Sequence, residues 1–526
     1  MLKKGLFVSA LTSALTSALT LISSSTAVAA ITPVLISGPS PYAVCSSHDN
    51  QLTGRTYLNA EVEPQVAVHG SNVIAVFHQD RKSNGGAHGI GVGFSTNGGA
   101  SWSETPIALT ACSPDTPLAL NNMWRASDPW VSFGPDGTAY FSALSFNVSV
   151  PNNANAVAAA RSTDGGATWD HIQPIPGSLF QTADSSTDKN STTADPTLNK
   201  TAYTVWDTLV LATDNPDDNP KTQAYTGPAF FSKTTDGGKT WSRAKVIVDT
   251  GNRQQTIGNI IVVDPRPGHH TLYDFTDLLL PPNTPFRGTH SNAQLAFVKS
   301  TDGGDTWTQP QVIAPFDSLG VIDPNTGRRA RVGDGLEEVA IDPANGKLYV
   351  VYESSSNFLK NSKQSAASFD DEILLVSSSD GGATWTAPQV IHQLANGMPT
   401  FTPTIAVNGG RVAVTYYDSR NLQPGQTANW PTDYWVEFST DGGATFGNEQ
   451  HIGATFDLAT APVARGFFLG DYEALQPSGS GFLAVYVKTN CDAPFPAGNP
   501  LCAPASSNTI ATSNTNPTDV FSASIP

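Results

Sequence analysis

Acidic, basic and aromatic side chains stand together where several short apolar stretches of the sequence begin or end. Carboxyl groups can donate and accept protons, and the planar guanidinium of arginine binds planar anions through paired hydrogen bonds. Such groups support chemistry only if the fold brings them to one place. The candidate residues are Asp80, Arg81, Arg125, Arg331, Glu337, Arg420 and Tyr472.

These residues lie at the ends of repeated β-hairpins. Two apolar stretches joined by a Gly, Pro or Asn turn predict two antiparallel strands, and seven such pairs occur along the chain. Examples are residues 63–80, 128–146, 339–354 and 403–420, and the last pair is 471–488. The start of the first strand and the end of the second meet at one edge. We therefore expect a ring of polar groups around a single axis, the usual place for a binding site.

An eight-residue motif, STDGGATW in its second copy, occurs six times, about 60–80 residues apart. That interval is the size of one propeller blade. The six copies occupy residues 95–102, 162–169, 234–241, 300–307, 378–385 and 439–446. A strand is expected on each side of every copy, so each unit would hold four strands.

The sequence therefore predicts an all-β propeller, a single domain over residues 31–526, with seven blades. Six blades plus a separate hairpin is the alternative. The seventh hairpin is followed only by a weak strand at residues 519–525, and a lone strand at 31–37 opens the domain. We expect that first strand to complete the last blade and close the ring, which removes exposed sheet edges.

The repeated motif itself predicts a stiff turn. Its Ser or Thr and its Asp can accept hydrogen bonds from nearby backbone N–H groups, and Gly-Gly supplies positive φ. Its Trp or Phe can be buried between sheets. One carboxylate per turn is a poor calcium site, so we expect a structural role.

The pattern S/T-x-D-x-G-x-x-W/F resembles the Asp-box, or bacterial neuraminidase repeat. The family includes sialidases, other glycan-active enzymes and propellers without known catalysis. In it, the Asp-boxes lie on the face opposite the active site. The resemblance covers nearly the whole of residues 31–526 and implies a sialidase-like propeller.

The resemblance also implies roles for individual residues. Sialidases use a tyrosine nucleophile assisted by a glutamate, and the matching positions are Tyr472 and Glu337. Asp80 is the nearest candidate for the acid/base. The substrate carboxylate would be held by arginines. Those candidates are Arg81, Arg125, Arg331 and Arg420.

Two parts of the sialidase pattern are missing. Residues 62–64 read Val-Glu-Pro where sialidases have Arg-Ile-Pro, and the loop KSNGGAHG at 82–89 contains no carboxylate. We expect an exo-acting glycosidase on an acidic sugar. The alternatives are a non-catalytic propeller that binds glycans or proteins, and a polysaccharide lyase.

Residues 1–30 have the layout of a secretory signal peptide, with a basic start, an apolar stretch and a small-residue cleavage site near Ala29/Ala30. The remaining chain would be secreted or periplasmic, and we expect a monomer with no membrane insertion. The net charge of −17 argues against nucleic acid as a partner.

The four cysteines are expected to form two disulfides after export. Cys491 and Cys502 close a short loop, which leaves Cys45 to pair with Cys112. Their spacing does not indicate a zinc site. No cofactor is expected, although aspartates on the axis make a structural calcium ion possible.

Overall fold

The structure is a computed structural model. The chain divides into two compact units, Met1–Ala30 and Ile31–Pro526. The predicted signal peptide lies outside the described residues except for Ala30. No helix in the part that the structure describes is long and apolar enough to span a bilayer. The described residues are 30–42, 45, 54–147, 154–180, 185–211, 225–280, 292–316, 320–333, 335–355, 371–394, 398–496, 498–503 and 516–526.

The prediction of an all-β fold is confirmed. The helices among the described residues are two short 3-10 turns, η4 (Leu458–Thr460) and η5 (Pro500–Cys502). After the two-residue strand β1 (Val34–Leu35) come β2 (Val62–His69), β3 (Asn72–Arg81), β4 (Ala87–Ser95), β5 (Ser103–Ile107), β6 (Arg125–Phe133), β7 (Ala139–Phe146), β8 (Asn155–Ser162) and β9 (Asp170–Pro174). Next come β10 (Ser185–Ala194), β11 (Ala202–Leu211), β12 (Tyr225–Gly227), β13 (Ala229–Thr234), β14 (Lys245–Val248), β15 (Gln254–Val263), β16 (Leu272–Leu280), β17 (Asn292–Ser300) and β18 (Gln311–Phe316).

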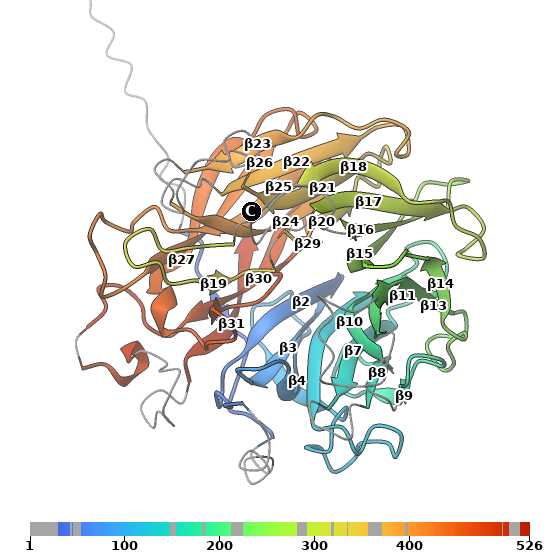
Figure 1. Cartoon of the computed structure of the whole chain (residues 1–526), viewed down its shortest axis with the longest axis horizontal. Helices are drawn as coiled ribbons and strands as arrows, with labels where there is room; N and C mark the ends of the chain where they lie inside the picture. Colours follow the sequence, from blue (N-terminus) through green and yellow to red (C-terminus); the bar gives the residue numbers. More distant parts are fainter. Residues whose placement is uncertain are drawn as a thin grey trace, which may run out of the picture. The chain divides into compact units, whose positions relative to one another are not determined.

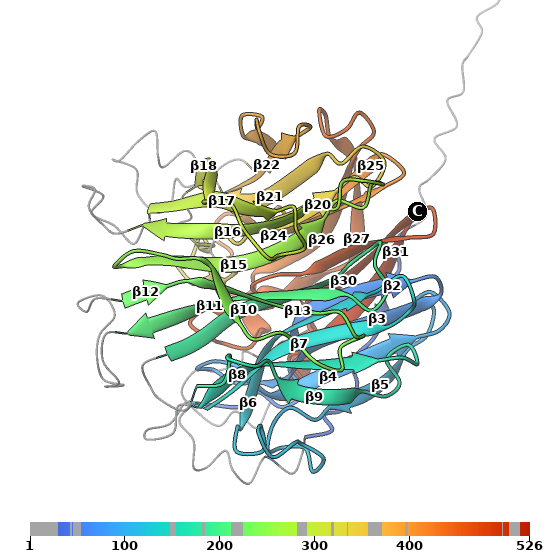
Figure 2. The ribbon, with the colours of Figure 1, turned by 90° about the vertical axis from the view of Figure 1, so that its right-hand side faces the viewer.

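The second half of the unit continues the same pattern. Its strands are β19 (Ala330–Arg331), β20 (Glu338–Ile341), β21 (Leu348–Ser354), β22 (Glu372–Ser378), β23 (Gln389–Gln393), β24 (Thr400–Asn408), β25 (Arg411–Asp418), β26 (Pro431–Ser439), β27 (Gly447–Asp457), β28 (Phe467–Phe468), β29 (Ala474–Ser478), β30 (Gly481–Thr489) and β31 (Thr518–Ile525). Most of the strands pair antiparallel with their neighbours in the sequence, as β2, β3 and β4 do in Figure 1 and β16 and β17 in Figure 2.

The strands form repeated four-stranded groups. The groups β20–β23 and β24–β27 are separate sheets. The groups β2–β5 and β6–β9 are joined at one pair, Ala87 with Ala126. The short strand β12 joins the group that begins at β10 to β15. The last group has the order β1-β31-β30-β29, in which β1 (Val34–Leu35) pairs antiparallel with β31.

The first strand of each group contacts the first strand of the next one. The contacts run from β2 to β6, β10, β15, β20, β24 and β29 in order, and β29 contacts β2. Because strand direction alternates within a group, the starts of these seven strands and the ends of the second strands lie at one edge. The turns between third and fourth strands lie at the opposite edge.

Five of these first strands carry a β-bulge near their start. In each, the register with the second strand shifts across two residues. The first of the two has positive φ: +53° at Glu63, +51° at Asp128, +44° at Lys189, +80° at Gly258 and +50° at Thr402. A non-glycine residue in this region is strained, and a bulge redirects the side chains around it. The bulges therefore decide which polar groups reach the axis.

The repeated octapeptide forms the hydrogen-bonded turn that its sequence predicts. In the second copy, the Ser162 hydroxyl accepts from the backbone N–H of Gly166 at 2.9 Å and donates to Asp164 Oδ1 at 2.8 Å. Asp164 Oδ1 accepts from the backbone N–H of Thr168 at 3.0 Å, and the Trp169 indole N–H donates to the Gly166 carbonyl at 3.2 Å. These bonds are internal to the turn, which supports its structural role.

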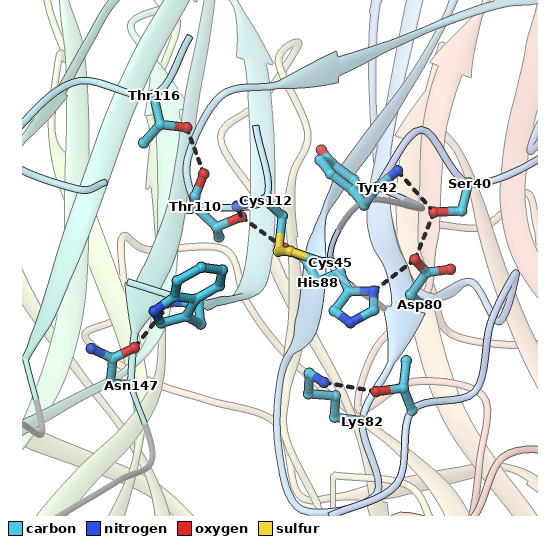
Figure 3. Close-up of a disulfide and its surroundings, with 12 residues drawn as sticks. Ser40, Tyr42, Cys45, Asp80, Lys82, His88, Thr110, Cys112, Thr116 and Asn147 are labelled. Carbon is cyan, nitrogen blue, oxygen red and sulfur yellow. Dashed lines mark hydrogen bonds and ion pairs between the residues drawn. A yellow bond between two sulfur atoms is a disulfide. The ribbon is translucent and has the colours of Figure 1, made fainter. Parts of the chain in front are cut away.

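The Cys45–Cys112 and Cys491–Cys502 disulfides are both present, which confirms the predicted pairing. Cys45 belongs to a segment whose Tyr42 is buried and donates its hydroxyl proton to the Ile90 carbonyl at 2.7 Å. Figure 3 shows this disulfide between the segment and residues near Thr110. The bridge attaches the start of the unit to the group formed by β2–β5.

Removal of the two disulfides is expected to have unequal effects. The bridges span 67 and 11 residues, so loop entropy predicts losses of about 4 and about 3 kcal/mol. The double variant C45A/C112A should unfold at lower urea concentration than C491A/C502A, both compared with the wild-type protein. Equal midpoints, or a lower midpoint for C491A/C502A, would contradict this expectation.

Candidate active site

The bulges of the first strands place a buried lysine among carboxylates. Lys189 Nζ donates to Asp471 Oδ2 at 2.8 Å and lies 3.5 Å from Glu63 Oε1 and 4.0 Å from Asp128 Oδ2. The backbone N–H of Lys189 also donates to Asp128 Oδ2 at 3.0 Å. Although burial opposes the charged form, these carboxylates outweigh it and raise the pKa of Lys189. The ammonium group is therefore held charged at the centre of four strand groups.

Asp471 binds a second cation on its other side. Arg331 donates to both carboxylate oxygens of Asp471, through Nε at 3.0 Å and through Nη2. Burial alone would raise the pKa of Asp471, but Lys189 and Arg331 outweigh it and hold that pKa well below its usual range. The paired geometry fixes the guanidinium of Arg331, which is half-buried.

Two cavities open beside this network. Cavity A has a volume of about 310 Å³ and cavity B about 440 Å³. Asp188, Lys189, Arg331 and Arg465 line both. Arg81 and Asp128 line cavity A only, and Arg329, Asp277 and Asp471 line cavity B only. Each cavity thus has three arginines in its wall, together with aspartates.

Two of these arginines have guanidinium groups without a partner among the described residues. Arg465 and Arg329 are exposed, and neither side chain makes a hydrogen bond or ion pair with the described residues. By contrast, Arg81 is buried, donates to the Gly86 carbonyl at 3.0 Å and packs over the Phe468 ring at 4.5 Å. Arg465 and Arg329 can therefore bind an anion without first losing a protein partner.

Asp188 is the aspartate that is open to both cavities. Its side chain is exposed, yet it lies deep among protein atoms, and burial followed by the nearby Asp128 raises its pKa to about 6. A carboxyl group with this pKa can donate a proton in mildly acidic solution and accept one at neutral pH. Asp188 is thus suited to proton transfer with a ligand in either cavity.

The phenol of Tyr472 lies outside cavities A and B. The residue is 6% exposed, and its hydroxyl donates to the Pro129 carbonyl at 3.4 Å. Burial, followed by Glu63, Asp128 and Asp471, raises its pKa well above the usual value. A tyrosine nucleophile needs the opposite shift, so this geometry does not favour phenolate formation.

Glu337 and Tyr472 lie at the same narrow space of the structure. Both line a narrow third space, cavity C, of about 20 Å³. Glu337 is 1% exposed, and burial followed by Asp277 raises its pKa well above the usual value. Cavity C is too small for a sugar, so neither residue reaches a ligand in cavity A or B.

Asp80 faces away from the two large cavities. Its carboxylate accepts from the Ser40 hydroxyl at 2.6 Å and the Asn59 backbone N–H at 2.8 Å, and lies 2.8 Å from His88 Nδ1. Figure 3 shows Ser40 and His88 directed at it. Successive residues of a strand point to opposite faces. Asp80 and Arg81 therefore cannot both reach the axis, and Arg81 is the one that does.

Arg125 lines neither cavity. Its Nη1 donates to Asn84 Oδ1 and to the Gly85 carbonyl, each at 2.7 Å. This contact holds the loop between β3 and β4 and leaves the guanidinium of Arg125 directed at the loop.

Arg420 also lies apart from the cavities, in a separate ion-pair network. It donates to Asp418 and to both carboxylate oxygens of Glu449, and its guanidinium stacks 3.7 Å from the centre of the Trp435 ring. The structure therefore brings together Arg81 and Arg331 from the predicted set but not Arg125 or Arg420.

Two groups of described residues have the composition of a metal site. In the first, Glu63 Oε2 lies 3.0 Å from His78 Nε2, with Asp128 beside them. The Lys189 ammonium already provides the positive charge there, and the backbone N–H of Asp128 donates to His78 Nε2 at 2.9 Å. A metal ion would have to displace these donors.

The second group is His392, Glu437 and Glu449. The Tyr416 hydroxyl lies 3.0 Å from His392 Nδ1, 2.9 Å from Glu437 Oε1 and 2.6 Å from Glu449 Oε1. The hydroxyl thus fills the position between the three side chains that a metal would take.

Lys189, Arg329 and Arg465 were missed by the sequence analysis. Arg329 belongs to the run Arg328-Arg329-Ala330-Arg331, a basic segment in which the sequence does not distinguish Arg329 from its neighbours. Arg465 lies in the connection before β28 at φ +68°, and no local pattern marks it. Lys189 occupies a bulge position that is filled by Glu63 and Asp128 in earlier groups.

Comparisons with known proteins give structural similarity only. No family model matches the chain, and no curated protein sequence matches it. A protein of unknown function from Dyadobacter fermentans is 13% identical with a TM-score of 0.42, over 73% of this chain and 97% of that one. An α-L-arabinanase from Penicillium chrysogenum, complexed with arabinobiose, is 14% identical with a TM-score of 0.41, over 69% and 93%.

The endosialidase of phage phi92 is 11% identical with a TM-score of 0.45, over 90% of this chain and 69% of that chain. Because all three TM-scores are below 0.5, the similarity does not identify the activity of this chain.

Replacement of Tyr472 by phenylalanine is expected to leave ligand affinity at cavities A and B within about twofold of wild type. The reason is that its hydroxyl contacts only the Pro129 carbonyl among the described residues, and loss of one such bond costs about 1 kcal/mol of folding stability. Isothermal titration with an acidic oligosaccharide measures the affinity. If Y472F binds the oligosaccharide at least tenfold more weakly, with an unchanged circular dichroism spectrum, Tyr472 contributes to the binding site and the expectation is wrong.

Proposed function

We propose that Ile31–Pro526 is a seven-bladed propeller closed by β1, and that its axial cavities bind and hydrolyse an acidic glycan. The contacts from β2 through β29 and back to β2, with β1 paired to β31, support seven blades and closure. The alternative with six blades would leave the β29–β30 hairpin outside the series, yet β29 contacts both β24 and β2.

The observation that carries the functional proposal is the convergence of arginines. Arg329, Arg331 and Arg465 line cavity B, and Arg81, Arg331 and Arg465 line cavity A. Arg331 is oriented by Asp471, whereas Arg465 and Arg329 have free guanidinium groups toward the cavities. Such a wall fits a carboxylated sugar, because guanidinium binds a carboxylate through paired hydrogen bonds.

Hydrolysis requires two carboxyl groups with different environments. We assign proton transfer to Asp188, which is open to both cavities. Asp128 is its partner in cavity A and accepts from the Ser127 hydroxyl at 2.7 Å and the Lys189 backbone N–H at 3.0 Å. Asp188 would protonate the leaving oxygen, and Asp128 would act as the carboxylate base or nucleophile. This assignment replaces Tyr472 and Asp80 as the chemical groups.

Binding without catalysis is the second candidate function. It is favoured by the hydrogen-bonded, buried Tyr472, which removes the nucleophile of the sialidase pattern from the cavities. A lyase has less support, because its base would be a tyrosine or histidine next to the uronate, and the residues that line cavities A and B include neither. Tyr472 lines only cavity C, and His78 is buried with a pKa lowered mainly by that burial.

Loss of the two free arginines should abolish recognition of acidic sugars. Each charged hydrogen bond contributes about 1.5–3 kcal/mol, so R465A and R329A should each weaken binding roughly tenfold to a hundredfold. The matched control is R243A, since Arg243 is also exposed but lines neither cavity. Titration calorimetry with sialyl and glucuronyl oligosaccharides, and with neutral arabinose oligomers, measures the affinities.

The same proteins are then assayed with fluorogenic sialosides and glucuronides. Release of the fluorophore supports hydrolysis, binding without release supports the non-catalytic alternative, and absorbance from an unsaturated uronate supports a lyase. If R465A, R329A and R243A bind acidic sugars as wild type does, the arginine-lined cavities are not the binding site.

The pH dependence of turnover should follow Asp188. Its pKa of about 6 means that the acid form, which protonates the leaving oxygen, is lost as the pH rises above about 6. We therefore expect kcat/KM to fall about tenfold per pH unit between pH 7 and 8. D188N should lower kcat at least a hundredfold while changing sugar affinity less than threefold. An unchanged pH profile in an active D188N variant would exclude Asp188 as the acid.

A further inference from the structure

A fourth space, cavity D, lies on the axis beyond the bulges of the first strands. Its volume is about 210 Å³. Its lining residues come from all seven first strands, β2, β6, β10, β15, β20, β24 and β29. In β2, β10 and β24 the lining includes Gln65, Thr192 and Thr404, which lie at or directly after the second residue of each register shift. Cavity D is therefore farther from the edge that carries cavities A and B.

Cavity C separates cavity D from the arginine-lined cavities. Cavities C and D share Trp130, Ile260 and Glu338, whereas cavity D shares no lining residue with cavity A or B. The volume of cavity C is about 20 Å³, which is room for one water molecule but not for a sugar. A ligand in cavity A or B therefore does not reach cavity D, which is a separate site.

The lining of cavity D offers no positive charge. No Lys, Arg or His is among the described residues that line it, and the ionisable group there is the carboxyl of Glu338. Glu338 is half-buried, and its carboxyl makes no hydrogen bond or ion pair with the described residues. Burial raises the pKa of Glu338 to about 8, so its carboxyl is largely protonated at pH 7. An acidic sugar would therefore find no cation in cavity D, in contrast to cavities A and B.

Uncharged polar side chains with unused hydrogen-bonding capacity converge on cavity D from four strands. Gln65 is 4% exposed; its Oε1 accepts from the Val66 backbone N–H at 2.8 Å, and its Nε2 has no acceptor among the described residues. The hydroxyl of Thr404, which is 2% exposed, and the amide of the half-buried Gln476 make no side-chain hydrogen bond with the described residues. Ser132 Oγ accepts from the Ala194 backbone N–H at 3.0 Å and keeps its own proton available. Because buried polar groups are normally hydrogen-bonded, this lining indicates a hydroxyl-rich occupant.

We propose that cavity D binds one uncharged sugar unit, with Gln65, Thr404 and Gln476 hydrogen-bonded to its hydroxyls and Trp130 packed against its ring. The indole of Trp130 is half-buried and is held by the Tyr472 ring, with centroids 5.5 Å apart, so it offers a fixed apolar wall. The volume of about 210 Å³ is smaller than the pockets of about 300–1,000 Å³ that hold drug-sized ligands. This site goes beyond the hydrolysis proposed for cavities A and B.

The test measures binding of monosaccharides to the full chain. Wild type, T404V, Q476A and the double variant R329A/R465A are titrated by calorimetry with D-glucose, D-galactose, D-mannose and L-arabinose, and with D-glucuronate as the charged counterpart of D-glucose. We expect wild type to bind at least one of the four uncharged sugars. T404V keeps the side-chain shape and removes the hydroxyl, and Q476A removes the amide. Each should weaken that binding about fivefold or more, because each removes hydrogen bonds to the sugar.

The matched control is R329A/R465A, which changes cavities A and B but no residue that lines cavity D. It should bind the uncharged sugar as wild type does. The proposal is overturned if none of the four uncharged sugars binds, if R329A/R465A loses that binding, or if folded T404V and Q476A bind as tightly as wild type. It is also overturned if R329A/R465A binds D-glucuronate more tightly than the uncharged sugar. Because no hydrolysis is measured, these results do not depend on the activity proposed for cavities A and B.

Discussion

The ammonium group of Lys189 is the contact on which the centre of the protein depends. It lies within 4.0 Å of carboxylates from β2, β6 and the segment before β29, and its own backbone has positive φ. An unpaired buried charge costs about 3–5 kcal/mol when its partner is removed, so three carboxylates at this point require a cation. The positive φ of Lys189 is strained, but the bulge places its ammonium group among the three carboxylates, and these ion pairs offset the strain. The position of Arg331 depends on the same contact, because Asp471 accepts hydrogen bonds from both Lys189 and Arg331.

Local interactions stabilise the turns of this chain, and long-range interactions hold the polar groups at its axis. The octapeptide turns are stabilised by hydrogen bonds between residues at most four apart, as in Ser162–Gly166 and Asp164–Thr168. They lie at the edge of the groups opposite the polar network. The polar network instead joins residues as far apart as Glu63 and Asp471. The repeated sequence can therefore stabilise each four-stranded group, while the residue type near the axis differs from group to group. Glu63, Asp128 and Lys189 are three different residues at equivalent bulges.

This division explains what the sequence predicts well. The all-β class and the two disulfides follow from turn signals, alternation and spacing, all of which are local. Arg81 and Arg331 were identified because the resemblance to sialidases implies arginines that hold a substrate carboxylate. Asp80 illustrates the limit: it is adjacent to Arg81, but its direction is set by Ser40 and Asn59, which come from a distant segment.

A β-bulge has the same effect, because one extra residue changes which side chains face the axis. Lys189 was missed for that reason, because it occupies a bulge of β10. Arg465 was missed for another reason, since it lies in the connection before β28, where no local pattern marks it.

The charge distribution gives the final constraint on function. The whole chain carries −17, so a distant anion is repelled by the protein as a whole. Attraction must come from within about one Debye length, about 8 Å at physiological ionic strength. Of the arginines in the cavity walls, Arg465 and Arg329 retain unpaired charge, whereas Arg331 is neutralised by Asp471. Recognition would therefore be short-ranged and geometric. This favours a sugar whose carboxylate enters the cavity over a polyanion held at the surface by long-range attraction.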